Sequence, residues 1–490
     1  MNMPSDQIDV SAYPSKEEIR DGMRILWDVP IRMDDGIVLR ADVYLPTAPG
    51  RYPAIMSYGP YGKGLAFQEK YSTSWEIMVR DYPDTARGSS NKYQNWEVVD
   101  PEKWVPDGYA CVRVDSRGAG RSPGYMELHS PREIRDFHDC IEWAAAQSWC
   151  SGKIGLAGIS YYATNQWRVA ATKPPHLAAI CTWEGYADRY RDSTYHGGIL
   201  CTMTGNTFNM QMKTVQHGLG ERGPRSRVTG ELVSGPETLS EEELAKNRFN
   251  LMGDVKSHTL DDQYQKDRSA RWDDIEVPLL SCGNWGGQGL HLRGNVEGFV
   301  RAASRQKWLE MHGGSHWAMF YTDYGNDLQK RFFGYFLKGE KNGWDAQPPV
   351  QLNVRHPGEK FVLRHEREWP LARTRWTTLY LDPANRALSA ERPRHAKTET
   401  ISFDATGDGV TFMSAPLTEE TEITGPSAVK LAVSSSTSDA DLFLVLRVFD
   451  PEGKELTFYG ALDPHTPIGQ GWLRASHRRL RTTRTTRSSH

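Results

Sequence analysis

Short apolar runs recur along the first 185 residues and again near residue 280, and segments with a helical pattern separate them. The runs cover residues 52–59, 109–118, 154–160, 177–183 and 277–285. Helices are predicted over 131–148, where Ser130, Pro131 and Glu133 suit a capped first turn, and over 161–171. This alternation predicts an α/β fold whose mostly parallel sheet is covered by helices on both faces.

The pattern changes at several places along the chain. Residues 23–43 alternate around a polar turn, which predicts an antiparallel hairpin. Residues 185–274 are polar, interrupted by glycines and helix-leaning, which indicates an insertion that caps the sheet. From residue 348 onward, short alternating runs indicate a β-sandwich or jelly roll. The Arg- and Thr-rich stretch 476–490 is typical of a disordered basic tail.

Length and charge narrow the classes of function. A chain of 490 residues exceeds the roughly 250–300 residues that one hydrophobic core supports, so more than one domain is expected. The formal net charge of -3, without a long basic stripe, argues against a nucleic-acid partner. The sequence lacks a signal peptide and a long apolar span, so we expect a cytoplasmic protein without membrane contact. The cysteines are scattered without CxxC pairs, which favours buried thiols over a metal site.

The strongest chemical signal is the segment GISYYA, residues 158–163, between a predicted strand and a predicted helix. A nucleophilic serine of this kind needs a sharp strand-to-helix turn, and small residues on either side let the backbone fold without collision. Gly158 and Ala163 meet that requirement around Ser160. We therefore predict Ser160 as a nucleophile, with the backbone N–H of Tyr161 directed at the developing oxyanion.

A serine hydroxyl needs a positioned base, and the segment KWLEMHGGSHW offers two histidines. His312 ends a predicted strand, whereas His316 follows two glycines on a loop that can reach over the sheet. We predict His316 as the base. A zinc site at HGGSH is disfavoured, because the helical frame and the glutamate of a paired-histidine site are missing.

The acid partner of the histidine is harder to place. The acid usually follows the strand that precedes the histidine strand. In this chain that segment contains Asn284, Gly286 and Gly287 but no carboxylate. Glu184 directly follows the strand 177–183, at the carboxyl edge of the sheet, so we predict Glu184 as the acid. The alternative is a structural Glu184 that pairs with Arg189 or Arg191.

Two loops complete the predicted site. The loop SYGPYGKG follows an early strand, and the Tyr61 hydroxyl is predicted as the second oxyanion donor. The loop DSRGAGRSPG, residues 115–124, has a glycine spacing that is wrong for a dinucleotide-binding fingerprint. We expect a shaped turn near the site there instead.

Taken together, these motifs resemble the cocaine esterase and X-Pro dipeptidyl-peptidase group of hydrolases, which includes the α-amino acid ester hydrolases. The resemblance rests on DSRGAGRSPG, GISYYA, GPYGK, SHW and TGPSAVKLAVSSSTSDADLFLVL. It implies an α/β-hydrolase domain with a helical cap and a C-terminal jelly roll, and it gives Ser160, His316, Tyr61 and the Tyr161 N–H the roles predicted above. It places the family's aspartate at Gly287, and the family's jelly roll continues beyond the point where this chain turns into its basic tail. A shortened jelly roll is therefore expected.

The expected domains are a hydrolase domain over residues 1–184 and 275–347, a cap over 185–274, a jelly roll over 348–475 and a tail over 476–490. The leading hypothesis is a serine hydrolase that cleaves an ester or amide of a small molecule through an acyl-enzyme on Ser160. An X-Pro dipeptidyl peptidase is one alternative, and it would need acidic groups in the cap to bind a free amine. A non-catalytic binding protein on a degenerate hydrolase scaffold is another. No cofactor, metal, nucleic acid or membrane partner is expected, and a homo-oligomer is left open.

Overall fold

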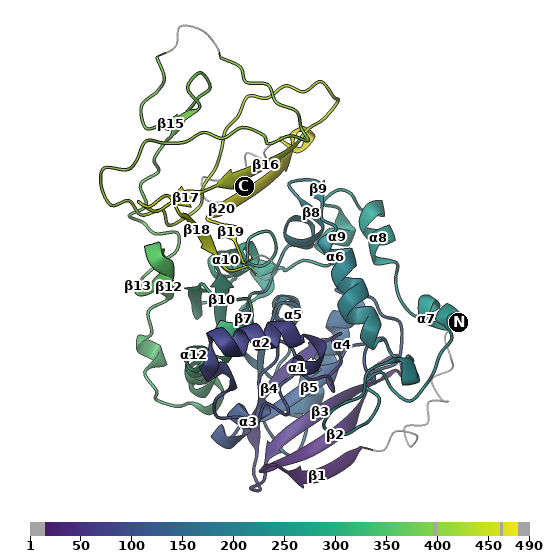
Figure 1. The fold of residues 1–490 in the computed structure, drawn as a ribbon. Helices are drawn as coiled ribbons and strands as arrows, with labels where there is room; N and C mark the ends of the chain where they lie inside the picture. Colours follow the sequence, from purple (N-terminus) through teal and green to yellow (C-terminus); the bar gives the residue numbers. More distant parts are fainter. Residues whose placement is uncertain (1–14, 395–398, 461–463, 479–490) are drawn as a thin grey trace.

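One large sheet of eleven strands dominates the chain between residues 16 and 366 (Figure 1). The computed structural model describes residues 15–394, 399–460 and 464–478. The strand order is β1-β2-β3-β5-β4-β6-β7-β10-β11-β12-β13. Neighbouring strands from β5 to β12 run parallel, and the pairs at the two ends of the sheet are antiparallel. The predicted α/β fold with a mostly parallel sheet is confirmed.

The strands of the main sheet lie where the apolar runs predict them. The runs 52–59 and 177–183 coincide with β4 and β7, and the predicted hairpin is β2 with β3. The bounds are β1 Lys16–Arg20, β2 Met23–Arg32, β3 Val38–Pro46, β4 Tyr52–Gly59, β5 Ala110–Asp115, β6 Cys150–Ile159, β7 Leu177–Trp183, β10 Leu279–Asn284, β11 Lys307–His312, β12 Val350–His356 and β13 Lys360–Glu366.

The helices that cover the sheet include both predicted ones. In α4 the Ser130 side chain accepts the backbone N–H of Glu133, and Pro131 stands at the first helical position, as predicted. The helix α5 begins directly after Ser160. The bounds are α1 Phe67–Lys70, α2 Ser72–Asp81, α3 Pro101–Trp104, α4 Pro131–Ala145, α5 Tyr161–Ala170, α10 Leu292–Arg301, α11 Ala318–Tyr321 and α12 Asp323–Phe333.

A helical cap is inserted between β7 and β10, as predicted. Its helices are short, and irregular turns connect them. A small hairpin, β8 with β9, lies at its start. The bounds are β8 Tyr195–His196, β9 Ile199–Leu200, α6 Met203–Thr207, α7 Glu241–Lys246, α8 Leu251–Ser257 and α9 Gln263–Lys266. The predicted limits of the cap, 185 and 274, stay a prediction.

The strands β12 and β13 differ from the prediction. Alternation after residue 348 placed them in the jelly roll, but β12 pairs in parallel with β11, and β13 pairs with β12. Both strands therefore extend the main sheet. A period of two residues predicts a strand but not its neighbour, because an edge strand of either domain shows the same alternation.

The C-terminal region carries short antiparallel strands beyond the main sheet (Figure 1). Its bounds are β14 Tyr380–Asp382, β15 Ala387–Ser389, β16 Asp441–Leu446, β17 Val448–Phe449, β18 Glu455–Phe458, β19 Thr466–Pro467 and β20 Gly469–Arg474. The apolar run 428–436, which reads as a strand in the sequence, forms none. From residue 479 the predicted basic tail lies outside the described residues. Within the described part of the chain, no helix combines the length and apolar character needed to cross a membrane.

Candidate active site

Ser160 occupies the sharp turn that the sequence predicts. It joins β6 to α5 with φ +57° and ψ −111°, a conformation that is strained for a residue with a side chain. Gly158 has φ +151°, and a Cβ atom there would lie 2.5 Å from the Cβ of Tyr162. A Cβ atom on Gly185 would lie 2.7 Å from that of Ala163. The small residues are therefore required by the close approach of β6, α5 and the end of β7.

The Ser160 hydroxyl contacts an imidazole, but not the predicted one. Its Oγ lies 3.1 Å from Nε2 of His291, a buried residue just before α10. The opposite nitrogen, Nδ1, lies 4.0 Å from Oε2 of Glu184. Burial, with the neighbouring charge of His316, lowers the pKa of His291 to about 3. In this arrangement His291 is a neutral ring that contacts Ser160, and its Nδ1 has no hydrogen-bond partner among the described residues.

His316 lies beside His291 and between two carboxylates. Its Nδ1 is 2.5 Å from Glu184 Oε2, and its Nε2 is 3.2 Å from Glu97 Oε1. The rings of His291 and His316 stack with centroids 4.9 Å apart. Burial disfavours a charged ring, but Glu184 and Glu97 outweigh burial and raise the pKa of His316 to about 10. The hydrogen bonds among the described residues thus join His316 to Glu184 and Ser160 to His291.

Glu184 lies at the centre of this group. It follows β7 with φ +51° and is fully buried. Besides His316, its carboxylate contacts Nε2 of His312 at 3.2 Å, and the Asn284 amide donates to it at 3.4 Å. Although burial opposes ionisation, the two histidines lower the pKa of Glu184 to about 2. Glu184 is therefore an anion held among imidazoles.

The alternatives for this region are also resolved by contacts. Glu184 pairs with histidines, whereas Arg191 pairs with Asp188 at 2.9 Å, so the structural pairing considered for Glu184 and Arg191 is not formed. His312 lies between Glu184 and Glu310, whose Oε2 is 2.7 Å from the His312 Nδ1. It therefore supports the acid and does not contact Ser160. A Cβ atom on Gly287 would lie 3.7 Å from Glu184 Oε2, so the two acid positions that the sequence considers converge on one place.

The predicted oxyanion donors lie around Ser160. Tyr61 and Tyr161 line the same pocket as Ser160, and their rings meet edge to face with centroids 5.9 Å apart. Burial raises the pKa of Tyr61, so its hydroxyl keeps the proton that a donor needs. The Tyr161 N–H is the first amide of α5, and an amide in that position has no acceptor within its own helix.

The glycine-rich loop 115–124 is hydrogen-bonded to the loop that carries Tyr61. Asp115 accepts the backbone N–H groups of Lys63 at 2.6 Å and Arg121 at 2.9 Å. The Lys63 ammonium is buried and lies 2.8 Å from Asp42. A Cβ atom on Gly120 would lie 2.1 Å from the Asp115 carboxylate. The loop is a shaped turn, as the sequence indicates, and the structure adds that it holds a buried ion network.

One set of side chains among the described residues has the spacing of a metal site. Glu184, His291 and His316 place donor atoms within 4.8 Å of one another. Two members of the set, Glu184 and His316, are already hydrogen-bonded. That contact is the one by which a carboxylate orients a catalytic imidazole. The set therefore fits acid–base chemistry without any further group.

His291 is the site residue that the sequence analysis missed. The segment GLHLRGN after β10 lacks a carboxylate, but it carries a histidine at the carboxyl edge of the sheet. Its place at this edge is the feature of the sequence that could have identified His291 as a site residue. The carboxyl ends of parallel strands meet at one edge, so a histidine after β10 lies close to groups after β6, β7 and β11.

Comparison with known proteins agrees with this geometry. Residues 35–318 match the family model described as X-Pro dipeptidyl-peptidase (S15 family), and residues 342–488 match that of the X-Pro dipeptidyl-peptidase C-terminal non-catalytic domain. The cocaine esterase of a Rhodococcus strain is 25% identical over 88% of this chain and 81% of its own length. A CocE/NonD family hydrolase of Staphylococcus aureus, whose crystal structure is known, is 29% identical with a TM-score of 0.77, over 100% of this chain and 83% of that one.

The S15 model spans more than half of the chain, and the similar proteins extend the match across both regions of the fold. The structure adds a serine in a strained turn, two imidazoles and a buried carboxylate at the carboxyl edge of the sheet. The chain belongs to the X-Pro dipeptidyl-peptidase (S15) family and is a serine hydrolase.

Proposed function

We propose that this serine hydrolase cleaves an acyl ester of a small molecule through an acyl-enzyme on Ser160. The observation that carries the proposal is the position of the Ser160 hydroxyl, which projects from a strained turn and contacts a neutral imidazole. The Glu184 carboxylate, which contacts His316, stabilises the positive charge that this ring gains when it accepts the serine proton. Attack on the carbonyl, loss of the alcohol and hydrolysis by water then follow on one residue.

We assign the base to His316 and the acid to Glu184. Of the two rings near Ser160, His316 has the higher proton affinity, because its Nδ1 contacts the Glu184 carboxylate at 2.5 Å. Burial lowers the pKa of His291 to about 3, which makes that ring a weak base. His291 then holds the resting hydroxyl. His316 accepts the serine proton in its unprotonated form, and separation of its Nε2 from Glu97 favours that form because the Glu97 carboxylate raises the pKa of the ring. The hydroxyl then reaches Nε2 by turning about the Cα–Cβ bond of Ser160.

Tyr61 and the backbone N–H of Tyr161 are proposed to stabilise the oxyanion. Preformed donors in a site that excludes water stabilise developing charge strongly, because they need no reorganisation during the reaction. The edge-to-face packing of the Tyr61 and Tyr161 rings supports this role, since it fixes the Tyr61 ring beside the turn. The Tyr61 loop is further supported by the Asp115 network.

An ester is favoured over an X-Pro dipeptide by the pocket that Ser160 lines. A peptidase of that kind must bind the ammonium group of its substrate, and carboxylates do so best. Among the described residues, no aspartate or glutamate lines the pocket. Turnover of a p-nitrophenyl ester, compared with that of an X-Pro anilide, measures this choice. A higher kcat/KM for the anilide would reverse it.

The nucleophile is tested by fluorophosphonate labelling. An activated serine reacts with such a probe, whereas a serine in a non-catalytic scaffold does not. We expect one label per chain on Ser160, with no label on Ser160→Ala and full labelling of Ser57→Ala, which removes a buried serine of β4. An unlabelled wild-type protein would favour the non-catalytic alternative.

The base is tested with two matched variants, His316→Asn and His291→Asn. We expect His316→Asn to lose about 10⁴-fold in kcat at neutral pH and His291→Asn to lose far less, because only the former removes the stronger proton acceptor. A larger loss in His291→Asn would assign the base to the ring that contacts Ser160 in the structure.

A further inference from the structure

The pocket that Ser160 lines contains a buried arginine. The serine, His291 and Arg189 of the cap line it, together with apolar groups such as Phe208 and Met212. The cavity volume is about 60 Å³. Since one water needs about 10–15 Å³ of such volume, the pocket accepts a small group. Arg189 is only 2% exposed, so its charge is removed from bulk water.

Arg189 has no carboxylate partner among the described residues. Its Nη1 donates to the Tyr186 hydroxyl at 3.2 Å, and its Nε has no acceptor. Its backbone N–H donates to Ser269. A buried cation is costly unless an anion and hydrogen-bond acceptors surround it. In the protein without substrate, Arg189 lacks such an anion among the described residues.

The acids nearest in sequence are already paired with other arginines. Asp188 contacts Arg191 at 2.9 Å, and Asp192 contacts Arg293 at 3.0 Å. Both acids therefore serve their own arginines. Arg191 also contacts Asp261 at 3.0 Å, and none of these acids forms an ion pair with Arg189.

The other charged groups near the pocket do not supply the anion. His129 packs between Tyr161 and Tyr186, and burial, together with Arg189, Arg168 and Arg268, lowers the pKa of His129 well below its ordinary value. His129 is therefore neutral, and it adds no negative charge. Glu133 accepts hydrogen bonds from the Tyr161 hydroxyl at 2.8 Å and from the backbone N–H of His129 at 2.7 Å, and it forms no ion pair with Arg189.

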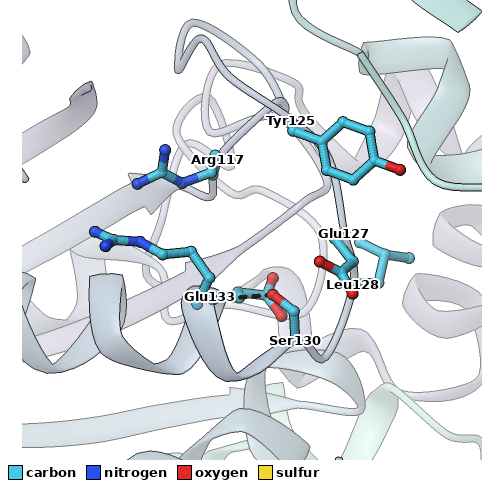
Figure 2. A pocket seen from close by; sticks show the side chains of 7 residues that line it. Arg117, Tyr125, Glu127, Leu128, Ser130 and Glu133 are labelled. Carbon is cyan, nitrogen blue, oxygen red and sulfur yellow. Dashed lines mark hydrogen bonds between the residues drawn. The ribbon is translucent and has the colours of Figure 1, made fainter. Parts of the chain in front are cut away.

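A neighbouring pocket, on the other side of Leu128, offers a contrast. Figure 2 shows Glu127, Ser130 and Glu133 on one side of it and Arg117 on the other. There the charges are satisfied within the protein. Arg117 donates to Asp136 at 2.8 Å, Arg132 also pairs with Asp136, and Arg268 pairs with Glu127. Arg189 differs from these arginines, because it lines the Ser160 pocket and has no carboxylate partner among the described residues.

We propose that the substrate carries a carboxylate, which Arg189 binds while Ser160 attacks an ester carbonyl a few bonds away. This proposal rests on the function proposed above. A guanidinium recognises a carboxylate with parallel hydrogen bonds, and the pair is strong where water is excluded. The substrate class is therefore a monoester of a short dicarboxylic acid. The same cation disfavours the ammonium group of a free peptide terminus.

The test compares two esters of equal shape. The monomethyl ester of glutaric acid carries a carboxylate, and the methyl ester of glutaramic acid carries a neutral amide in its place. We expect the wild-type protein to hydrolyse the acid with a kcat/KM about tenfold or more above that of the amide, because a hydrogen bond to a charged group is worth about 1.5–3 kcal/mol. A pH-stat measures both rates.

Arg189→Met should remove this preference to within about twofold, and Arg189→Lys should retain part of it, because lysine keeps the charge without the planar fork. Melting curves of both variants verify folding. Equal rates for both esters in the wild-type protein, with the amide ester hydrolysed well, would overturn the carboxylate proposal and leave the serine hydrolase assignment intact.

Protection of Ser160 separates the remaining outcomes. Free glutarate should slow fluorophosphonate labelling in the wild-type protein but not in Arg189→Met. If both esters resist hydrolysis and Ser160 is labelled, protection by glutarate supports the anion site, and its failure overturns it. An absence of labelling in the wild-type protein would instead contradict the proposed function.

Discussion

The main sheet and the C-terminal region bury their apolar side chains to very different extents. The strands β4 to β7 are almost wholly buried, and Phe332 of α12 is 0% exposed beneath them. In the C-terminal region β16 alternates between half-buried and exposed positions, and Phe443 is 63% exposed. The first region can hold charged groups out of water, whereas the second cannot. All the residues assigned to the chemistry lie in the first region.

The two regions nevertheless meet at the site. The β10–α10 loop, residues 285–291, ends at His291. Gln288 in this loop donates to the carbonyls of Pro467 and Ile468 at 3.0 Å each. A Cβ atom on Gly286 would lie 2.1 Å from the carbonyl oxygen of Tyr459. The C-terminal region thus contacts the loop that ends at His291, without contributing a reacting group.

The largest effect is expected from the buried acid. Glu184→Gln should lower kcat by about 10³–10⁴-fold, because an amide cannot stabilise the imidazolium. Adding Gly287→Asp to this variant should restore activity at least tenfold, since the new side chain would start 3.7 Å from the position of the lost carboxylate. Steady-state kinetics of both variants measure these effects. Equal activity of Glu184→Gln and wild type would remove Glu184 from the mechanism.

The next effect tests the stability of the two regions directly. Phe332→Ala should lower the free energy of unfolding by about 3–5 kcal/mol, because it opens a cavity in the core. Phe443→Ala should change it by less than about 0.5 kcal/mol, because the side chain is exposed. Urea unfolding followed by fluorescence measures both. A comparable loss in the two variants would mean that the C-terminal strand is covered in solution.

A smaller effect is expected where the regions meet. Gln288→Ala removes the hydrogen bonds to the C-terminal carbonyls and should lower kcat/KM about fivefold, because a net hydrogen bond contributes about 1 kcal/mol. The exposed Gln263→Ala in the cap is the matched control and should leave the rate unchanged. An unchanged rate in Gln288→Ala would show that the loop keeps its place without the C-terminal region.

The smallest effect is a displacement of the pH profile by Glu97→Gln. Glu97 stabilises the charged form of His316, so its neutral replacement should lower the pKa of His316. A base acts when unprotonated, so the rising limb of kcat/KM against pH should move to lower pH. On that limb each unit of displacement raises the rate about tenfold. A limb that moves to higher pH would contradict the assignment of His316.

The sequence predicts those features that depend on local pattern. The turn at Ser160 needs small residues within a few positions, and the strands need only short apolar runs. Glu184 could be predicted because sheet topology brings strand ends together. His291 lies at the same edge, after β10, so the same topology could have identified it. The neighbours of β12 could not be found in this way, because strand alternation does not encode which strand is its partner.

The acceptors of Gln288 are main-chain atoms, at residues 467 and 468. Every amino acid carries such an oxygen, so substitutions there need not disturb the anchor as long as the backbone keeps its path. A substitution at residue 468 that keeps the backbone path should therefore leave the histidine loop in register. Sequence divergence in the C-terminal part of the family would then be compatible with an unchanged reaction.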